Sequence, residues 1–117
     1  MSMDSSILKD VKQALGVEES STSFDKDIII FTNAALFVLP QLGVGPPDGF
    51  SISDDSTTWE DVILDRSDLI GGVKAFVCLD TRLKFDPPQM GYYVNLMKEQ
   101  VEELKWRIVS QVESKTS

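Results

Sequence analysis

The sequence predicts an all-α protein, a small bundle of four to five helices with one long ordered loop and a long C-terminal helix. Two observations lead to this fold class. Apolar residues recur at intervals of three and four along most of the chain, which is the spacing of one helix face. The recurrence is interrupted by "QLGVGPPDGF", a segment whose glycines and prolines stop regular structure. At 117 residues, the chain is expected to form a single domain (1–117) with one modest core.

The composition argues against several classes of function. The chain has no histidine, which removes the commonest general base and the commonest metal ligand. Its single cysteine, Cys78, rules out an intrachain disulfide, suits a reducing cytosol and cannot build a zinc site alone. Neither a P-loop pattern nor GxGxxG is present. We therefore expect no enzymatic activity, no cofactor and no metal.

Charge and hydropathy narrow the expected partners. The net charge of −8 opposes nucleic-acid binding, which depends on Lys and Arg neutralising phosphates. No apolar run approaches the roughly 20 residues that span a bilayer. The N-terminal "MSMDSSILKD" lacks the basic-then-apolar layout of a signal peptide. No membrane association is expected.

The first two helices are predicted at about 5–15 and 24–40. Gly16 can end the first, whose apolar positions follow helical spacing: Ile7, Leu8, Val11, Ala14 and Leu15. The second is apolar on most sides, and we take its Phe31 as a core anchor. A helix that is apolar all round is buried all round. In so small a protein it lies either at the centre of the bundle or at a subunit interface.

The loop is predicted at 41–57. Adjacent prolines stiffen it, and loops of this length are usually functional or disordered. We expect an ordered loop that folds back, with Phe50, Ile52 and the following Trp59 as core anchors covering the end of the second helix.

The polar residues at the tip of this loop, which we call the loop crest, have two possible roles. Asp48, Asp54 and Asp55 are candidate interface residues that face a neighbouring subunit or a channel, or the loop is only a lid on its own core. Between Asp48 and Asp68 there are seven acids and one base, but the EF-hand spacing is missing. A solvated acidic surface explains this composition better than a calcium site.

Two further helices are predicted at about 58–64 and 67–84. A capping box from Thr57 to Glu60 starts the shorter one. The longer carries an inner apolar stripe that includes the core anchor Phe76. Gly71 and Gly72 either allow close approach of a neighbouring helix or mark a frayed first turn.

The last helix is predicted at about 87–113, capped by Asp86. Its apolar residues, with Met97 and Leu104 as core anchors, alternate by four and three: Met90, Val94, Met97, Val101, Leu104 and Ile108. We expect the first half to pack inside the domain and the second half to reach a partner. The candidate interface residues there are Trp106, Ile108, Val109 and Val112.

Five segments occur in an order that resembles one protein family: "FDKDIIIFTNAA", "LPQLGVGPPDGFSI", "TWEDVI", "VKAFVCLDTRLKFDPP" and "VEELKWRI". Together they look like the head–tail connector (adaptor) proteins of long-tailed bacteriophages, especially those of Gram-positive hosts. The resemblance covers about Ile7 to Ile108. One departure is Gly91, which follows "FDPPQM" and weakens the start of the final helix.

The resemblance implies a structural virion protein with no catalytic residues. Such all-α subunits form a ring, dodecameric in the virion, beneath the portal protein after DNA packaging. The ring extends the DNA channel and gives tail-completion or stopper proteins a docking surface. It implies a location at the head–tail junction, and in the host cytoplasm during assembly. An acidic subunit suits a channel through which DNA slides without specific binding.

A second class of function stays open from the sequence. A small helical regulatory or antitoxin-like protein that binds one partner helix would share this composition. A stable small dimer in solution favours that alternative, and a concentration-dependent ring favours the connector.

Overall fold

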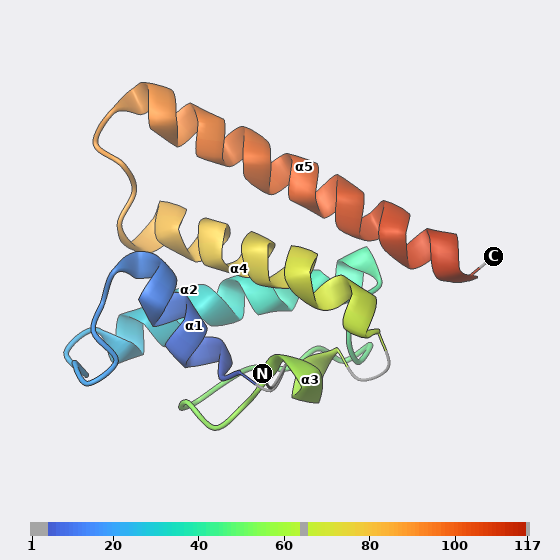
Figure 1. The fold of residues 1–117 in the computed structure, drawn as a ribbon, viewed down its shortest axis with the longest axis horizontal. Helices are drawn as coiled ribbons and strands as arrows, with labels where there is room; N and C mark the ends of the chain where they lie inside the picture. The colour runs from blue at the N-terminus through green and yellow to red at the C-terminus, as the bar shows by residue number, and fades with distance from the viewer. Residues whose placement is uncertain (1–4, 64–65, 117) are drawn as a thin grey trace.

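A computed structural model describes residues 5–63 and 66–116. Within them the chain is helical and has no strand, which confirms the all-α prediction (Figure 1). In chain order the elements are α1 (Ile7–Leu15), α2 (Asp25–Val38), the 3-10 turn η1 (Leu39–Leu42), α3 (Trp59–Val62), the 3-10 turn η2 (Ser67–Leu69), α4 (Ile70–Phe85) and α5 (Gly91–Thr116).

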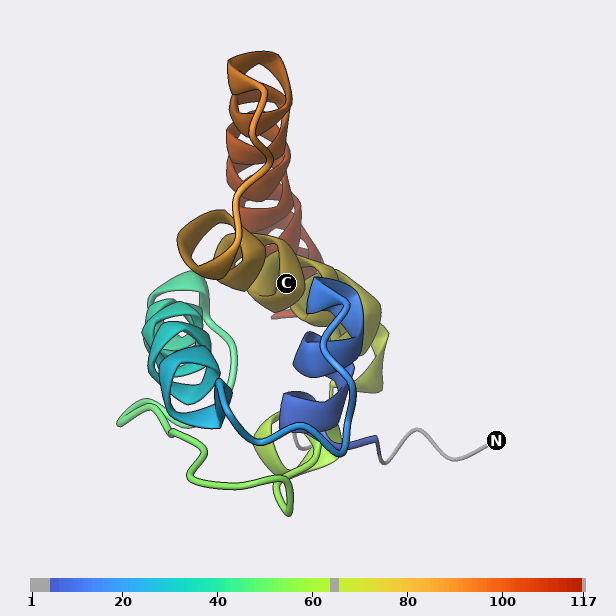
Figure 2. The ribbon, with the colours of Figure 1, turned by 90° about the vertical axis from the view of Figure 1, so that its left-hand side faces the viewer.

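Helix α4 is the centre of the fold. Figure 2 shows it between α5 on one side and the α1–α2 pair on the other, and α4 contacts all three. Its inner stripe, Val73, Phe76 and Val77, is fully buried. Gly72 lies in the first turn against α5, where an added Cβ would sit 3.7 Å from Cγ1 of Ile108. The two long helices therefore meet closely at this end of the bundle.

A buried lysine fixes the connection between α1 and α2. Lys12 is only 3% exposed, and its Nζ lies 2.8 Å from a carboxylate oxygen of Asp25. The same ammonium donates to the backbone carbonyls of Glu19 (3.0 Å) and Ser21 (2.6 Å). A buried charge needs such partners. Gly16 ends α1 in the left-handed conformation (φ 75°), as its position predicted.

The long loop returns to the body of the domain. Val44 and Ile52 are buried, Phe50 packs against the core, and Trp59 is fully buried at the start of α3. The indole Nε1 of Trp59 donates to Asp10 at 2.8 Å, which satisfies its polar atom inside the core. The apolar residues of the loop thus form one side of the core.

The observed helix boundaries differ from the predicted ones beside the two adjacent prolines and at the helix caps. The last helix starts at Gly91 rather than 87, because a residue before proline avoids helical angles and Pro87 precedes Pro88. Asp86 instead follows α4 as its C-cap. The capping box lies one residue later than predicted, between Thr58 and Asp61. Leu64, the predicted end of that helix, lies outside the described residues.

Candidate assembly surface

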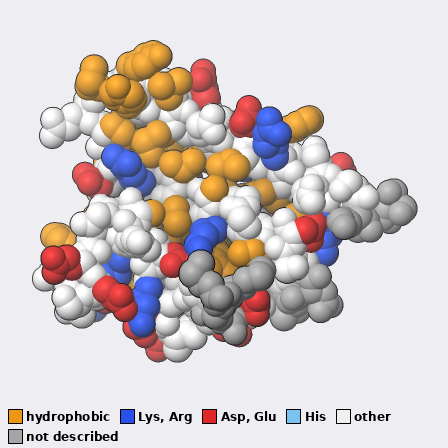
Figure 3. All heavy atoms as spheres, in the orientation of Figure 1, with side chains coloured by type: hydrophobic (Ala, Val, Ile, Leu, Met, Phe, Trp, Pro, Cys, Tyr) orange, Lys and Arg blue, Asp and Glu red, His pale blue; other side chains and the backbone are white. Residues whose placement is uncertain are grey.

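The first half of α5 projects from the bundle. The turn from Asp86 to Met90 carries the chain away from α4, and no residue of the segment 91–100 is buried. Four large apolar side chains are left exposed there: Met90 (61%), Tyr92 (67%), Tyr93 (51%) and Leu96 (39%). Figure 2 shows the projection, and Figure 3 shows hydrophobic side chains gathered over it. We call these four residues the α5 surface.

The inner face of the second half of α5 packs within the monomer, whereas the first half, expected inside the domain, is the part that projects. Val101 and Ile108 are buried in the core, at 4% and 3% exposure. Ile108 was a candidate interface residue, and this assignment is corrected because its side chain lies within the domain's own core. Val112 packs against Gly43, where an added Cβ would lie 3.0 Å from its Cγ1. The sequence placed the apolar stripe correctly but not the half of the helix that leaves the domain.

Polar contacts also fasten the end of α5. Arg66 donates to the carbonyl of Gln111 at 3.0 Å, and the Gln111 amide donates to Asp68 at 2.9 Å. Hydrogen bonds from Arg66 (3.1 and 3.3 Å) and from Gln111 lower the pKa of Asp68 to about 2. Through these hydrogen bonds Asp68 joins the turn before α4 to α5.

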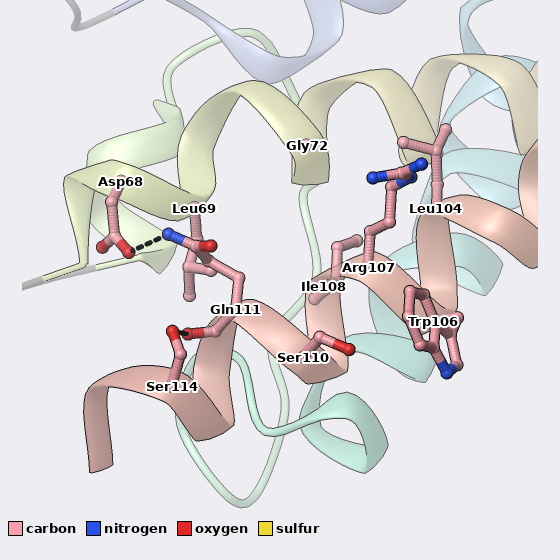
Figure 4. A pocket seen from close by; sticks show the side chains of 10 residues that line it. All are labelled: Asp68, Leu69, Gly72, Leu104, Trp106, Arg107, Ile108, Ser110, Gln111 and Ser114. Carbon is pink, nitrogen blue, oxygen red and sulfur yellow. Dashed lines mark hydrogen bonds between the residues drawn. The ribbon is translucent and has the colours of Figure 1, made fainter. Parts of the chain in front are cut away.

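A groove of about 520 Å³ lies beside these contacts, between the start of α4 and the second half of α5 (Figure 4). Leu104, half-buried, lines it and packs against the core. Trp106 points away from Gly72 in Figure 4 and is 67% exposed. Val109 is half-buried. Of the candidate interface residues on α5, Trp106 alone presents most of its side chain to solvent.

A second groove, of about 340 Å³, runs along the projecting half of α5 beside the end of α4. Met97, predicted as a core anchor, is half-buried and lines this groove instead of the closed core. Arg82 of α4 lies at the same groove with Tyr93 and Leu96. This arrangement combines aromatic and aliphatic side chains with one cation.

The outer face of α2 is also uncovered. Ile30 is 62% and Phe37 is 70% exposed, and Ala34 between them is exposed. Of the two alternatives for this helix, the centre of the bundle does not apply, because α1 and α4 pack on one side of α2 and leave these described side chains exposed. The subunit interface stays a prediction. Phe31, expected as a core anchor, is half-buried. We call Ile30, Ala34 and Phe37 the α2 surface.

The acids of the loop crest are exposed and lie apart from the candidates on α5. Asp54 accepts from the backbone N–H (2.9 Å) and hydroxyl (2.6 Å) of Ser56, and these bonds lower its pKa. Asp55 lies 4.0 Å from Lys9. Figure 1 places the last part of the loop, just before α3, at the opposite edge of the molecule from α5. The two predicted groups of interface residues thus do not form one surface.

Sequence reasoning missed most of the exposed apolar residues. Tyr92 falls outside the four-three alternation of the last helix, and Ile30 and Phe37 fall on a helix expected to be covered. The sequence signal for an exposed apolar residue is an aromatic side chain that falls outside the apolar stripe of its helix, as Tyr92 does. Core anchors Ile52, Trp59 and Phe76, in contrast, are all buried in the structure.

The fold and these surfaces define a small helical protein whose most prominent features are uncovered apolar side chains. The described residues contain no group of three acids or cysteines that could hold a metal. No described helix has the length and hydropathy to cross a membrane.

A family model described as "Phage connector protein" matches residues 7–115, nearly the whole chain. The chain therefore belongs to the phage connector protein family, and it is a structural protein of the phage virion. No curated protein and no solved structure matches it significantly.

Proposed function

We propose that this protein is a ring-forming head–tail connector. It docks under the portal after DNA packaging, extends the DNA channel and presents the attachment surface for a tail-completion or stopper protein. Membership of the connector family is the observation that carries this proposal. The copies assemble in the host cytoplasm and remain at the head–tail junction, twelve to a ring.

The uncovered apolar side chains support an assembly role. A fully buried aromatic side chain removes roughly 150–250 Å² from water, and burial stabilises by about 25 cal/mol per Å². Tyr92 and Tyr93 are more than half exposed in the single chain. Covering them in a contact therefore supplies several kcal/mol, to order of magnitude, toward association. Exposed apolar side chains would also suit a protein that binds one partner helix, so the family match is what favours the connector.

The negative net charge supports the proposal that the ring forms a channel for DNA. A net charge of −8 on each subunit repels phosphates, so a ring of such subunits lets the duplex slide. Specific DNA binding would oppose this role.

The test is to mix the purified protein with the portal of the same phage and with an unrelated portal as control. Sedimentation velocity and electron microscopy report the products. We expect a complex with the cognate portal only, with the connector as a ring at one end. A stable small dimer that ignores the portal would overturn the proposal and favour the regulatory alternative.

A further inference from the structure

Two apolar surfaces on different elements are uncovered in the same chain. The α5 surface projects on one side of α4, and the α2 surface lies on the other side, facing outward (Figure 2). Within α5, Tyr92 to Leu96 covers just over one helical turn, and Met90 lies in the turn immediately before the helix. Helix α4 lies between α5 and α2, so the two surfaces do not cover each other within one chain.

Charged side chains without ion pairs flank both surfaces. Arg82, at the groove beside Tyr93 and Leu96, forms no ion pair among the described residues. On α2, Asp27 is exposed one turn before Ile30 and likewise forms none among the residues described.

The loop supplies a second acid. Asp48 is exposed and has no ion pair within the described part of the chain. The next residue, Gly49, lies so close to Pro40 that an added Cβ would sit 3.6 Å from its Cγ. This contact holds Asp48 near the end of α2, so that an acid lies toward each end of the α2 surface. Lys26 lies beside Asp27 and Glu99 lies one turn after Leu96, so each surface also carries one charge of the opposite sign. The proposed pairing uses Arg82 and the two acids.

We infer that the α5 surface of one copy packs on the α2 surface of a second copy, with Arg82 facing Asp27 and Asp48. Pairing two α5 surfaces would leave the α2 surface, with Asp27 and Asp48, uncovered in both copies. A contact between different surfaces is heterologous, and copies joined in this way form a ring if the rotation closes. The inference deepens the proposed function, on which the closed ring rests, by naming the two faces of the contact.

The experiment uses two variants of the full chain, each removing one surface. Tyr92→Ser with Leu96→Ser removes the α5 surface, and Ile30→Ser with Phe37→Ser removes the α2 surface. Gln13→Ser with Glu18→Ser is a matched control, because both residues are exposed and lie at the end of α1, outside both surfaces. Circular dichroism melting confirms that every variant is folded, and sedimentation velocity measures association at matched concentrations.

We expect the wild type and the control to associate beyond dimers as concentration rises. Each surface variant alone should remain monomeric. An equimolar mixture of the two should form a heterodimer and stop there, because it contains one intact pair of surfaces. The inference is overturned if either variant alone still associates, if the mixture stays monomeric, or if the wild type is monomeric up to millimolar concentration. A wild type that is monomeric yet binds the portal refutes this contact and leaves the proposed function standing.

A charge exchange tests the polar part of the contact. Arg82→Glu should weaken association about five-fold, the factor that corresponds to roughly 1 kcal/mol, the upper end for an exposed ion pair. Adding Asp27→Lys and Asp48→Lys to the same chain should restore it, whereas adding them to the wild type should weaken it. Association that is unchanged by Arg82→Glu, or not restored by the exchange, contradicts the assigned pairing.

Discussion

Asn33, on α2, forms two hydrogen bonds with the backbone of a single loop residue, Ile52. Its Nδ2 donates to the Ile52 carbonyl at 3.0 Å, and its Oδ1 accepts from the Ile52 N–H at 2.8 Å. The side chain thus replaces a strand partner for the loop and places Ile52, 3% exposed, in the core. An asparagine supplies both a donor and an acceptor in this geometry.

Replacing Asn33 with alanine should destabilise the protein by roughly 1–3 kcal/mol, since two partly buried backbone groups lose their partners. Urea unfolding measures the change. Asn95→Ala, at an exposed position on α5 with no hydrogen bond to its side chain among those described, is the control. Equal stabilities for the two variants would show that the loop does not depend on Asn33.

Gly43 and Gly16 offer a matched pair for the packing of α5. Both have positive φ, 90° and 75°, so alanine is strained at either position by roughly 1–2 kcal/mol. Only at Gly43 does the new Cβ meet a neighbour, Val112, at 3.0 Å. Gly43→Ala should therefore cost more than Gly16→Ala in urea unfolding, and adding Val112→Ala should remove the excess. If both substitutions lower the free energy of unfolding equally, Val112 does not pack against Gly43 in the folded protein.

Replacing Asp48, Asp54 and Asp55 together with serine tests the loop crest. Exposed ion pairs contribute about 0–1 kcal/mol, so the monomer should keep its melting temperature within a few degrees. We expect ring formation or head–tail joining to change, as measured by sedimentation and by portal binding. If assembly is unaltered without the three acids, the loop is only a lid.

Cys78 should be slow to react. Burial raises the pKa of its thiol to about 11, and the charge of Asp10 adds to the effect while that of Lys74 opposes it. Because of this raised pKa, the thiolate population at pH 8 should be roughly 100-fold below that of a thiol with the ordinary pKa. The thiolate is the reactive form, so alkylation should be slow. Iodoacetamide labelling followed by mass spectrometry measures the rate, with the urea-unfolded protein as control. Similar rates in both states would contradict a buried thiol.

The protein should have no measurable affinity for duplex DNA at physiological salt. Its net charge of −8 leaves few cations to neutralise phosphates. A gel shift with a short duplex tests this. A shift that weakens steeply as salt is added would contradict both the prediction and a channel that repels DNA.

Local chemistry in the sequence determined most of the elements. The periodicity of apolar residues predicted the helices, Gly16 predicted the end of α1, and "FDPP" predicted the end of α4 near Phe85. The apolar residues of the loop also predicted that it folds back. These features depend on backbone angles and on neighbours within a few residues, which the sequence contains directly.

The tertiary structure alone decided which apolar side chains are covered. The sequence gives the same apolar character to Leu96 and Ile108, yet α4 covers Ile108 and leaves Leu96 exposed. The reason is the angle at which the turn after α4 sends α5 away, so that the two helices separate toward the start of α5 (Figure 1). Likewise, α2 is apolar all round, but α1 and α4 pack on its inner side and leave Ile30 and Phe37 exposed. Burial depends on where other elements lie in space, and periodicity along one helix does not contain that information.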